Sequence, residues 1–256
     1  MKLPQVFKQG IWVLFMAVLL LGVPRLGGLA ADQFDYSAVD PDGAFAWISV
    51  HHIVQALIVL ILMVVISKVS AIRFGFGWGD RKVGLLYVRV LVLIFAAYTM
   101  ISIIIMVATG SWASFPYPFT ARNVAGQLGF QLLLSGPSEE LIFRAFAITM
   151  LALVLKGAVF GGETAIGKGL TTVLGGELTA ANLIATIVFG LAHIRVTFAP
   201  FSLSYSTFQV FYSMVLGLFY GVCYERSESM VYPMIMHSIT NVVAVGVLVA
   251  AEFIVH

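Results

Sequence analysis

Long stretches without a charged residue divide this chain and are the first pattern in its sequence. A helix needs about 20 apolar residues to cross the hydrocarbon core of a bilayer, and its backbone groups must be paired within the helix. An outer-membrane strand would alternate apolar and polar residues, which runs such as Leu57–Ile66 do not do. The pattern predicts an all-α, polytopic transmembrane helical bundle with spans at Gln9–Pro24, Gly43–Ser67, Val83–Val107, Asn123–Leu155, Leu178–Ile194, Val196–Tyr224 and Ser229–Ala251.

The fourth of these segments is the longest and the least regular. Gly136-Pro137 lies at its middle, where proline removes a backbone donor and clashes with the preceding turn. We therefore expect a kink or break in the helix there, with Ser135 or Ser138 capping the part that restarts. The bundle has seven spans, or eight if this segment crosses twice. Only three charged residues interrupt the segment: Glu139, Glu140 and Arg144.

The composition indicates that lipid surrounds most of this chain. We expect a single integral membrane domain that covers residues 1–256. Hydrophobic residues make up 61% of the chain and charged residues 10%, with a mean hydropathy of +1.02. A soluble domain carries about 25% charged residues. The formal net charge of +2 argues against a nucleic-acid partner and leaves the bilayer as the expected surrounding.

The distribution of Lys and Arg predicts the orientation, because cytoplasmic loops carry an excess of them. The loops on the other side hold only Arg25, Arg122 and Arg195, together with an acidic loop at residues 32–42. We expect an integral protein of the cytoplasmic membrane with its N-terminus in the cytoplasm. The loops expected there hold Lys2, Lys8, Lys68, Arg73, Arg81, Lys82, Lys156, Lys168 and Arg226.

Two segments have a second interpretation. Lys2 and Lys8, the apolar run Ile11–Gly22 and the small residues Gly28-Leu29-Ala30 are also typical of a cleaved secretory signal. Mass spectrometry of the mature N-terminus distinguishes the two. The glycine-rich stretch Gly157–Thr179 indicates a flexible cytoplasmic loop, with a re-entrant or gating segment as the alternative.

Two adjacent glutamates inside a span need an explanation, since a charged side chain at mid-bilayer costs about 2.5–3.5 kcal/mol on insertion scales. Glu140 and Arg144 are spaced i,i+4 and can pair along one helix face. Glu139 lies about 100° around the helix and faces elsewhere. The pairing explains one glutamate, and the other is a candidate functional group.

Two later spans carry polar residues one turn apart on one face. Phe189 precedes His193 by four residues, and His237 precedes Asn241 by four. Buried imidazoles and amides in lipid need partners. Taken singly, each is more typical of a hydrogen bond between helices. Taken together, they predict that three helices bring a carboxylate, two imidazoles and an amide into one site around Glu139.

The other candidate groups receive no role from the sequence. His51 and His52 lie at the mouth of the second span and His256 at the C-terminus. The single cysteine, Cys223, excludes an intrachain disulfide. A lone cysteine in an apolar helix behaves as a small hydrophobe rather than a nucleophile.

The three motifs, Glu-Glu-x-x-x-Arg at 139–144, Phe-x-x-x-His at 189–193 and His-x-x-x-Asn at 237–241, resemble those of the CPBP family. That family comprises the type II CAAX prenyl endopeptidases and related bacteriocin-processing and immunity proteins. The resemblance covers a catalytic core from about residue 120 to 250, and the first 110 residues match only as generic spans. Ala145 departs from the glycine that commonly follows the arginine, which affects packing rather than chemistry.

The resemblance implies an intramembrane endopeptidase acting on a membrane-associated, possibly prenylated, protein or peptide. Glu139 is then the general base on the attacking water, helped by His193. His237 and Asn241 stabilise the oxyanion, the largest single term in much acyl-transfer catalysis. Glu140 and Arg144 support the first motif.

A metal is the main open point about cofactors. Glu139, His193 and His237 together would form a two-histidine, one-carboxylate set suited to catalytic zinc. Members of the family are often labelled metalloproteases, and a glutamate-dependent mechanism without metal is also argued for them. The helical His-Glu-x-x-His signature is absent from the sequence, and we expect no tightly bound metal.

Two other functions compete with the protease. The first is a non-catalytic immunity or regulatory protein that binds a peptide in the same cavity. The second is a transporter that uses the glutamates and histidines as a proton relay. Transport is the least favoured, because the sequence shows no paired repeat of broken helices.

Overall fold

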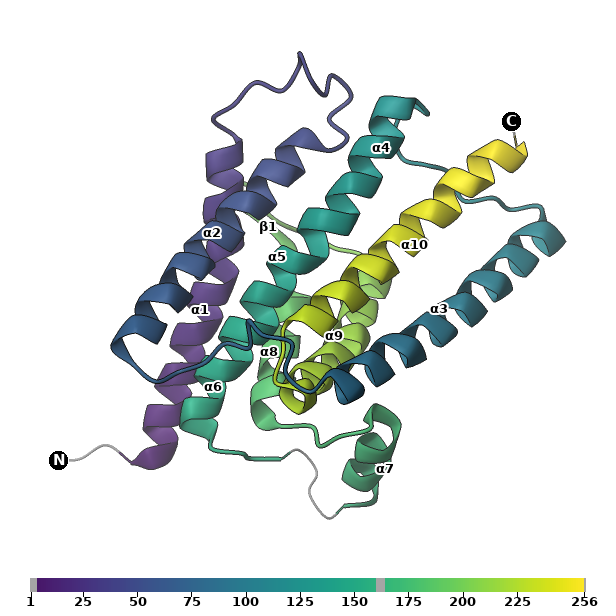
Figure 1. Ribbon diagram of the computed structural model, residues 1–256. Helices are drawn as coiled ribbons and strands as arrows, with labels where there is room; N and C mark the ends of the chain where they lie inside the picture. The colour runs from purple at the N-terminus through teal and green to yellow at the C-terminus, as the bar shows by residue number, and fades with distance from the viewer. Residues whose placement is uncertain (1–3, 160–163, 256) are drawn as a thin grey trace.

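A computed structural model describes residues 4–159 and 164–255, and its architecture is a bundle of helices (Figure 1). The α-helices are α1 (Gln5–Ala31), α2 (Ala46–Val69), α3 (Arg81–Thr109), α4 (Ala121–Phe130), α5 (Gly136–Glu140), α6 (Ala147–Leu155), α7 (Ala165–Leu174), α8 (Ala180–Ala192), α9 (Thr207–Ser227) and α10 (Val231–Val255). Two π-helical stretches and two strands complete it: η1 (Gln131–Ser135), η2 (Leu141–Phe146), β1 (Arg195–Phe198) and β2 (Phe201–Ser204).

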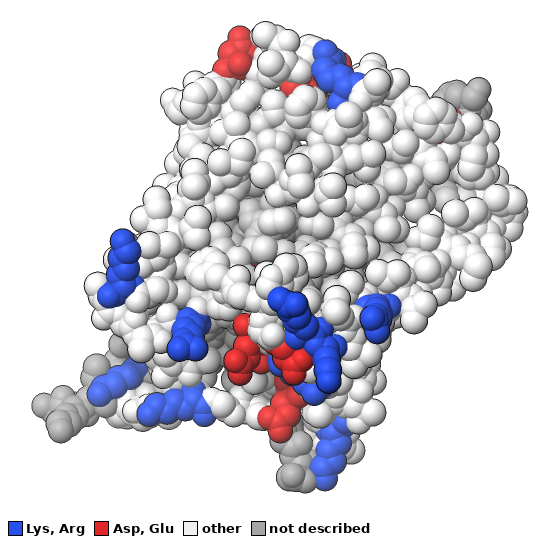
Figure 2. Space-filling model, in the orientation of Figure 1, with Lys and Arg blue, Asp and Glu red and all other residues white. Residues whose placement is uncertain are grey.

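The surface of the bundle is that of a membrane protein. Five helices in the described part of the chain, α1, α2, α3, α9 and α10, are long and apolar enough to span a bilayer. In Figure 2 most Lys and Arg lie at the lower end, near α7 and the start of α1, and a broad uncharged belt lies above them. The predicted helical membrane protein is confirmed. The number of seven or eight spans stays a prediction, because α8 has 13 residues and residues 121–155 form a series of shorter segments.

The fourth predicted span does not break at Gly136-Pro137. The backbone stays helical from Ala121 to Leu155, and Gly136 itself is α-helical with φ −56° and ψ −54°. Wide π-helical turns on both sides of α5 adjust the hydrogen bonding around the proline, which has no N–H to donate. The predicted break and serine cap are therefore wrong, and the predicted kink stays a prediction. Ser138 Oγ instead lies 3.1 Å from the Ser135 carbonyl oxygen within the helix.

The sixth predicted span is wrong at its beginning. The residues after Val196 form the antiparallel hairpin β1–β2, and α9 starts only at Thr207. Pro200 lies between the two strands and cannot continue a helix. The Ser206 side chain then caps α9 by accepting a hydrogen bond from the Gln209 amide at 3.3 Å. The hairpin therefore separates α8 from α9, at the point where the sequence predicted two spans divided only by Arg195.

The glycine-rich stretch contains more structure than a flexible loop. It includes α7 and an isolated antiparallel bridge between Val159 and Thr179. Gly175 ends α7 in the left-handed region, with φ +71°, which glycine adopts without strain. In Figure 1, α7 lies beyond the lower ends of α9 and α10. Gly161, Gly162 and His256 lie outside the described residues.

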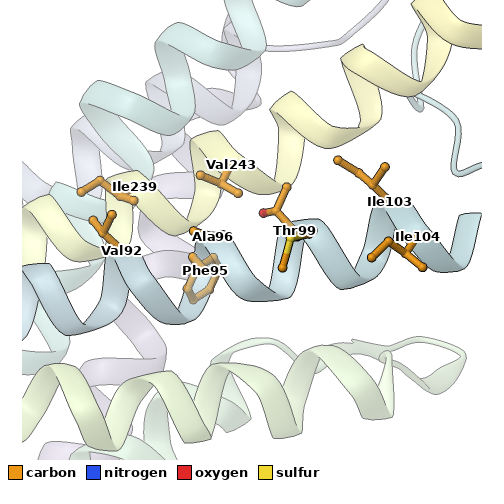
Figure 3. A pocket seen from close by; sticks show the side chains of 9 residues that line it. Val92, Phe95, Ala96, Thr99, Ile103, Ile104, Ile239 and Val243 are labelled. Atoms are coloured by element: carbon orange, nitrogen blue, oxygen red, sulfur yellow. The ribbon is translucent and has the colours of Figure 1, made fainter.

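Close helix packing brings distant parts of the chain together. Trp12 Nε1 on α1 donates to the Met150 carbonyl oxygen at 3.0 Å, and Gln9 Nε2 donates to that of Val154 at 3.1 Å, so α1 is fastened to α6. In Figure 1, α10 crosses between α3 and the α4–α6 segment. An apolar groove of about 510 Å³ lies between α3 and α10, with Thr99 among its lining residues (Figure 3).

Asp40, in the loop before α2, organises the start of that helix. Its carboxylate accepts hydrogen bonds from the backbone N–H groups of Ala44, Phe45 and Ala46 at 2.7–2.8 Å. Burial alone would raise the pKa of Asp40, but these three donors and the charge of Arg122 outweigh it and hold the pKa below its ordinary range. The ionised carboxylate therefore stabilises the loop and the helix together.

Asp40→Ala should lower the free energy of unfolding by about 2 kcal/mol, because three buried donors lose a charged acceptor. The loss should be measurable as a lower apparent melting temperature in detergent at pH 7. Since the folded pKa is depressed, the stabilisation is present above the unfolded pKa of about 4 and disappears as the pH falls through the folded value. Asp35→Ala, at an exposed turn residue, is the control; equal melting temperatures for both variants would contradict the assignment.

Candidate active site

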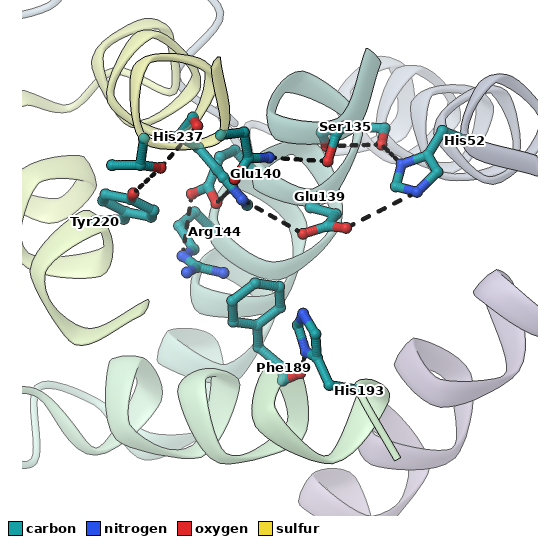
Figure 4. Close-up of polar contacts among 12 residues, drawn as sticks. His52, Ser135, Glu139, Glu140, Arg144, Phe189, His193, Tyr220 and His237 are labelled. Carbon is teal, nitrogen blue, oxygen red and sulfur yellow. Dashed lines mark hydrogen bonds and ion pairs between the residues drawn. The ribbon is translucent and has the colours of Figure 1, made fainter. Parts of the chain in front are cut away.

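Glu140 is the central buried charge of the bundle. Its side chain is fully buried, and Arg144, one turn later, lies with Nε 3.1 Å from Glu140 Oε2 (Figure 4). Both groups are removed from solvent, so each compensates the desolvation of the other. The pairing predicted from the i,i+4 spacing is present.

Aromatic rings enclose the guanidinium of Arg144. Its central carbon lies 4.4 Å from the ring centroid of Phe189 on α8 and 5.7 Å from that of Tyr220 on α9. A buried guanidinium gains from the negative faces of such rings. Phe189 therefore connects the first and second sequence motifs, and α8 and α9 are both placed by the same cation.

His237 on α10 links the two glutamates. Its Nδ1 lies 2.8 Å from Glu140 Oε1, and its Nε2 lies 3.7 Å from Glu139 Oε2. Because a carboxylate can only accept, Nδ1 carries a proton and Nε2 faces Glu139. The ring of Tyr220 packs 5.3 Å from the imidazole, and Tyr220 Oη contacts Thr240 Oγ1 at 2.9 Å. The orientation of His237 is thus determined from both sides.

His52 on α2 contacts the other oxygen of Glu139. Its Nε2 lies 3.9 Å from Glu139 Oε1, and its Nδ1 contacts Ser138 Oγ at 2.6 Å and Gln55 Nε2 at 3.0 Å. An amide NH₂ only donates, so Nδ1 is an acceptor and the ring proton lies on Nε2, towards Glu139. No role for His52 was predicted from the sequence, and the structure places it beside Glu139. Gln55, three residues later on the same helix face, was the signal for it.

His193 closes the site from the end of α8. Its Nδ1 donates to the Phe189 carbonyl oxygen at 2.8 Å, and its ring packs edge-on against the Phe189 ring at 4.8 Å. A carbonyl oxygen only accepts, so the neutral ring has a bare Nε2. In Figure 4 the imidazole projects from α8 towards Glu139 across an open space.

Asn241 lies one turn beyond His237 and contacts η1. Its Nδ2 donates to Ser135 Oγ at 3.0 Å. This contact holds the amide on the same side of α10 as the His237 imidazole. Of the predicted site residues, His237 lies beside both glutamates, whereas His193 and Asn241 form hydrogen bonds with Phe189 and Ser135.

The two glutamates differ in access to solvent. The side chain of Glu139 is 18% exposed, whereas that of Glu140 is 0% exposed. Two carboxylates face one guanidinium, and three imidazoles surround them, so the cluster is neutral when one imidazole carries a second proton. Glu139 is thus the carboxylate that a water molecule and a substrate can reach.

The predicted metal ligands are Glu139, His193 and His237, from three different segments of the chain. Within the described parts of the chain, no group of three or more His, Cys, Asp or Glu side chains is arranged to hold one. His237 Nδ1 is bound to Glu140 and His193 Nδ1 to Phe189, which leaves Nε2 of each ring for another partner. A metal-bound histidine commonly donates its other ring N–H to a carboxylate or carbonyl in this way, so a metal held by Glu139, His193 and His237 stays a prediction.

Comparison with known proteins agrees with this arrangement. Residues 121–243 match the family model described as type II CAAX prenyl endopeptidase, Rce1-like. The matched segment is slightly less than half of the chain. It supports the family resemblance stated from the three motifs, and the family suggests a protease. No match was found among curated proteins or among solved structures.

The Rce1-like segment contains the three motifs but not the whole site. Glu139, Glu140, His193, His237 and Asn241 all lie within residues 121–243. His52 and Gln55 come from α2, before the matched segment begins. The N-terminal helices therefore contribute polar side chains to the region that surrounds Glu139.

Gly136→Ala tests the close approach that positions His237. A Cβ atom at this position would lie 2.8 Å from the Ser238 backbone nitrogen and 3.1 Å from the His237 carbonyl carbon. Since the neighbours are backbone atoms, α10 must move, at a cost of about 1–3 kcal/mol. We expect a lower melting temperature and reduced turnover.

Gly129→Ala is the matched control in the same helical segment, because its added Cβ meets no described atom within 4 Å. It should leave both quantities unchanged or raise stability slightly. Equal behaviour of the two variants would show that the contact between α5 and α10 does not position the site.

Proposed function

We propose that this protein is an intramembrane endopeptidase that hydrolyses a peptide bond in a membrane-associated protein or peptide, with Glu139 as the general base. The observation that carries the proposal is the position of Glu139. It is the partly exposed carboxylate of a buried cluster, with imidazoles 3.7 Å and 3.9 Å from its two oxygens. A group held in this way has a fixed direction and access to water.

In the proposed reaction, Glu139 takes a proton from a water molecule while the oxygen of that water attacks the scissile carbonyl carbon. The bare Nε2 of His193 accepts a hydrogen bond from the same water and orients it. His52 holds the other side of the carboxylate through its Nε2–H. A positioned base of this kind contributes about 10²–10⁴-fold to the rate.

The tetrahedral intermediate needs donors for its negatively charged oxygen. His237, in its doubly protonated form, donates from Nε2 while Nδ1 stays bound to Glu140, and the Asn241 amide donates one turn away. Such preorganised donors act strongly in a low-dielectric site. Glu139, now a carboxylic acid, returns its proton to the departing amine as the C–N bond breaks. Glu140 and Arg144 remain paired throughout.

The family suggests the substrate class. Rce1-like proteins are described as CAAX prenyl endopeptidases, so the proposed substrate has an aliphatic C-terminal segment, with or without a prenyl group. The apolar surface of the bundle supports a substrate that lies in the bilayer beside the enzyme. A peptide-binding immunity or regulatory protein would use the same cavity without turnover, and the variants below separate the two.

Glu139→Gln should reduce kcat by about 10²–10⁴-fold, because it keeps the size and polarity of the side chain and removes the base. Comparative proteomics of membranes with wild type and this variant supplies the peptides whose cleavage is then measured with purified protein. His193→Ala should reduce turnover as well.

Cys223→Ser is the control, since Cys223 is buried among apolar side chains of another helix, and it should leave turnover unchanged. A folded Glu139→Gln protein with wild-type cleavage would reject Glu139 as the general base, and the absence of any cleaved peptide with wild-type protein would reject the enzyme. Loss of turnover in the Cys223→Ser protein would contradict the proposal that Glu139 activates the attacking water.

Metal removal should leave cleavage intact. Dialysis against a chelator, followed by a turnover assay and zinc analysis of the purified protein, tests this. Retention of one zinc per chain together with loss of cleavage on chelation, restored by added zinc, would replace the glutamate mechanism with a metal-dependent one.

A further inference from the structure

The loop between α2 and α3 is an exposed aromatic and basic segment that takes no part in the proposed reaction. Glycines separate three aromatic residues along it, at positions 74–79. Phe76 and Trp78 are 50% and 52% exposed. The basic residues on either side of them are exposed as well: Arg73, Arg81 and Lys82. Aromatic rings beside basic residues are typical of the level of the lipid headgroups.

Backbone hydrogen bonds fix this loop to the turn between α9 and α10. The Met230 N–H donates to the Gly75 carbonyl oxygen at 2.9 Å. The Asp80 N–H donates to the Ser227 carbonyl oxygen at 2.8 Å. The side chain of Phe74 is buried. The loop is therefore held against the start of α10, while its other two aromatic side chains stay exposed.

Trp78 is positioned by a contact on each side of the loop. Its ring centroid lies 6.1 Å from that of Tyr232 on α10, and the guanidinium carbon of Arg81 lies 5.7 Å from the Trp78 centroid. The Asp80 carboxylate accepts hydrogen bonds from two backbone N–H groups in the first turn of α3, at 2.9 Å and 3.1 Å. This acid is thus bound to the helix, and the side chains of Arg81 and Lys82 remain available at the surface.

Basic residues gather at the level of this loop. In Figure 2 a row of Lys and Arg crosses the lower part of the molecule, below the uncharged belt. In Figure 1 the chain between α2 and α3 passes at that level. Leu85 and Leu86, which follow in α3, are exposed apolar side chains, so the lipid-facing surface begins directly after the loop. Glu228 on the adjoining turn is acidic, but the basic residues of the loop outnumber it.

We propose that the α2–α3 loop binds acidic phospholipids of the surrounding bilayer. Arg73, Arg81 and Lys82 contact the phosphate groups. Phe76 and Trp78 lie among the headgroups. Each Lys or Arg close to a bilayer surface strengthens the attraction to anionic lipid by about fivefold. A zwitterionic lipid such as phosphatidylcholine has no net charge and lacks this attraction. Lipid binding at the loop is independent of the proposed function.

Lipid bound at the loop also determines the depth of α10. That helix begins at Val231, and His237 lies six residues later, about 9 Å along the helix axis. Gly84 on α3 approaches the Tyr232 ring so closely that an added Cβ atom would overlap it. Because the loop and the starts of α3 and α10 are bound to one another, a lipid at the loop holds His237 at a fixed depth in the bilayer.

The first test measures which lipids the full-length protein retains. Protein reconstituted in vesicles of equal parts phosphatidylcholine and phosphatidylglycerol is extracted in mild detergent, and native mass spectrometry counts the lipids still bound. The wild type should retain phosphatidylglycerol over phosphatidylcholine by about tenfold or more, and the Arg81→Gln/Lys82→Gln protein should lose most of this preference. Arg81→Lys keeps the charge and should retain the preference.

Lys8→Gln/Lys156→Gln is the matched control, because it removes two charges from exposed residues outside the loop. This control should keep the preference for phosphatidylglycerol. Equal retention of both lipids by the wild type would overturn the site. An equal loss in the two double variants would also overturn it, since the preference would then belong to the basic surface as a whole.

Gly79→Ala tests whether binding needs the loop in its fixed position. Gly79 has φ +48°, and an added Cβ atom would overlap the Ser227 carbonyl oxygen, so the loop must move. The preference for phosphatidylglycerol should fall. Gly77→Ala is the control, because its Cβ meets no described atom within 4 Å. A folded Gly79→Ala protein with the full preference would contradict binding by the fixed loop.

Fluorescence of Trp78 measures the depth of the loop. The chain has four tryptophans, so the signal of Trp78 is the difference between the wild type and Trp78→Phe. In vesicles with brominated acyl chains, bromine near the headgroup end of the chain should quench this signal more than bromine near the methyl end. The reverse order would place the ring in the hydrocarbon and overturn the headgroup contact.

Discussion

The pairing of Glu140 with Arg144 is the interaction on which the rest of the site depends. An unpaired charge of either sign would be unstable in the interior of a lipid-embedded bundle, and here the two are held at 3.1 Å with almost no exposure. Glu140 also accepts from His237 on α10, while Arg144 lies against Phe189 on α8 and Tyr220 on α9. One ion pair therefore fixes the relative positions of four helical segments. Glu139, next to it, takes its place from that arrangement.

The spacing of residues within single helices was enough to predict much of this site. The i,i+4 relation of Glu140 and Arg144 and the one-turn spacing of Phe189 and His193 are properties of a single helix, and the cost of polar groups in lipid implies that they meet. The participation of His52 was not predictable from spacing, because it depends on how α2 packs against α5. Its neighbour Gln55 was a weak signal. The path of the chain around Pro137 was also missed, because π-helical turns let a helix pass a proline without breaking.

The prediction of the boundary between α8 and α9 was wrong for a related reason. Apolar composition alone does not distinguish a span from a short hairpin of apolar residues, and Pro200 was the local sign that the helix could not continue. That hairpin has a consequence for the site. It places Arg195 opposite α1, at a cavity that α1, α2 and the end of α8 also line.

The most direct test of this account is an experimental structure of the Glu139→Gln protein with an uncleaved substrate peptide. The account predicts a scissile carbonyl oxygen within hydrogen-bonding distance of both His237 and Asn241. The residue-139 side chain should face the same carbonyl carbon. A peptide bound in the groove between α3 and α10, or a residue-139 side chain directed at the acyl chains and away from the two histidines, would contradict it.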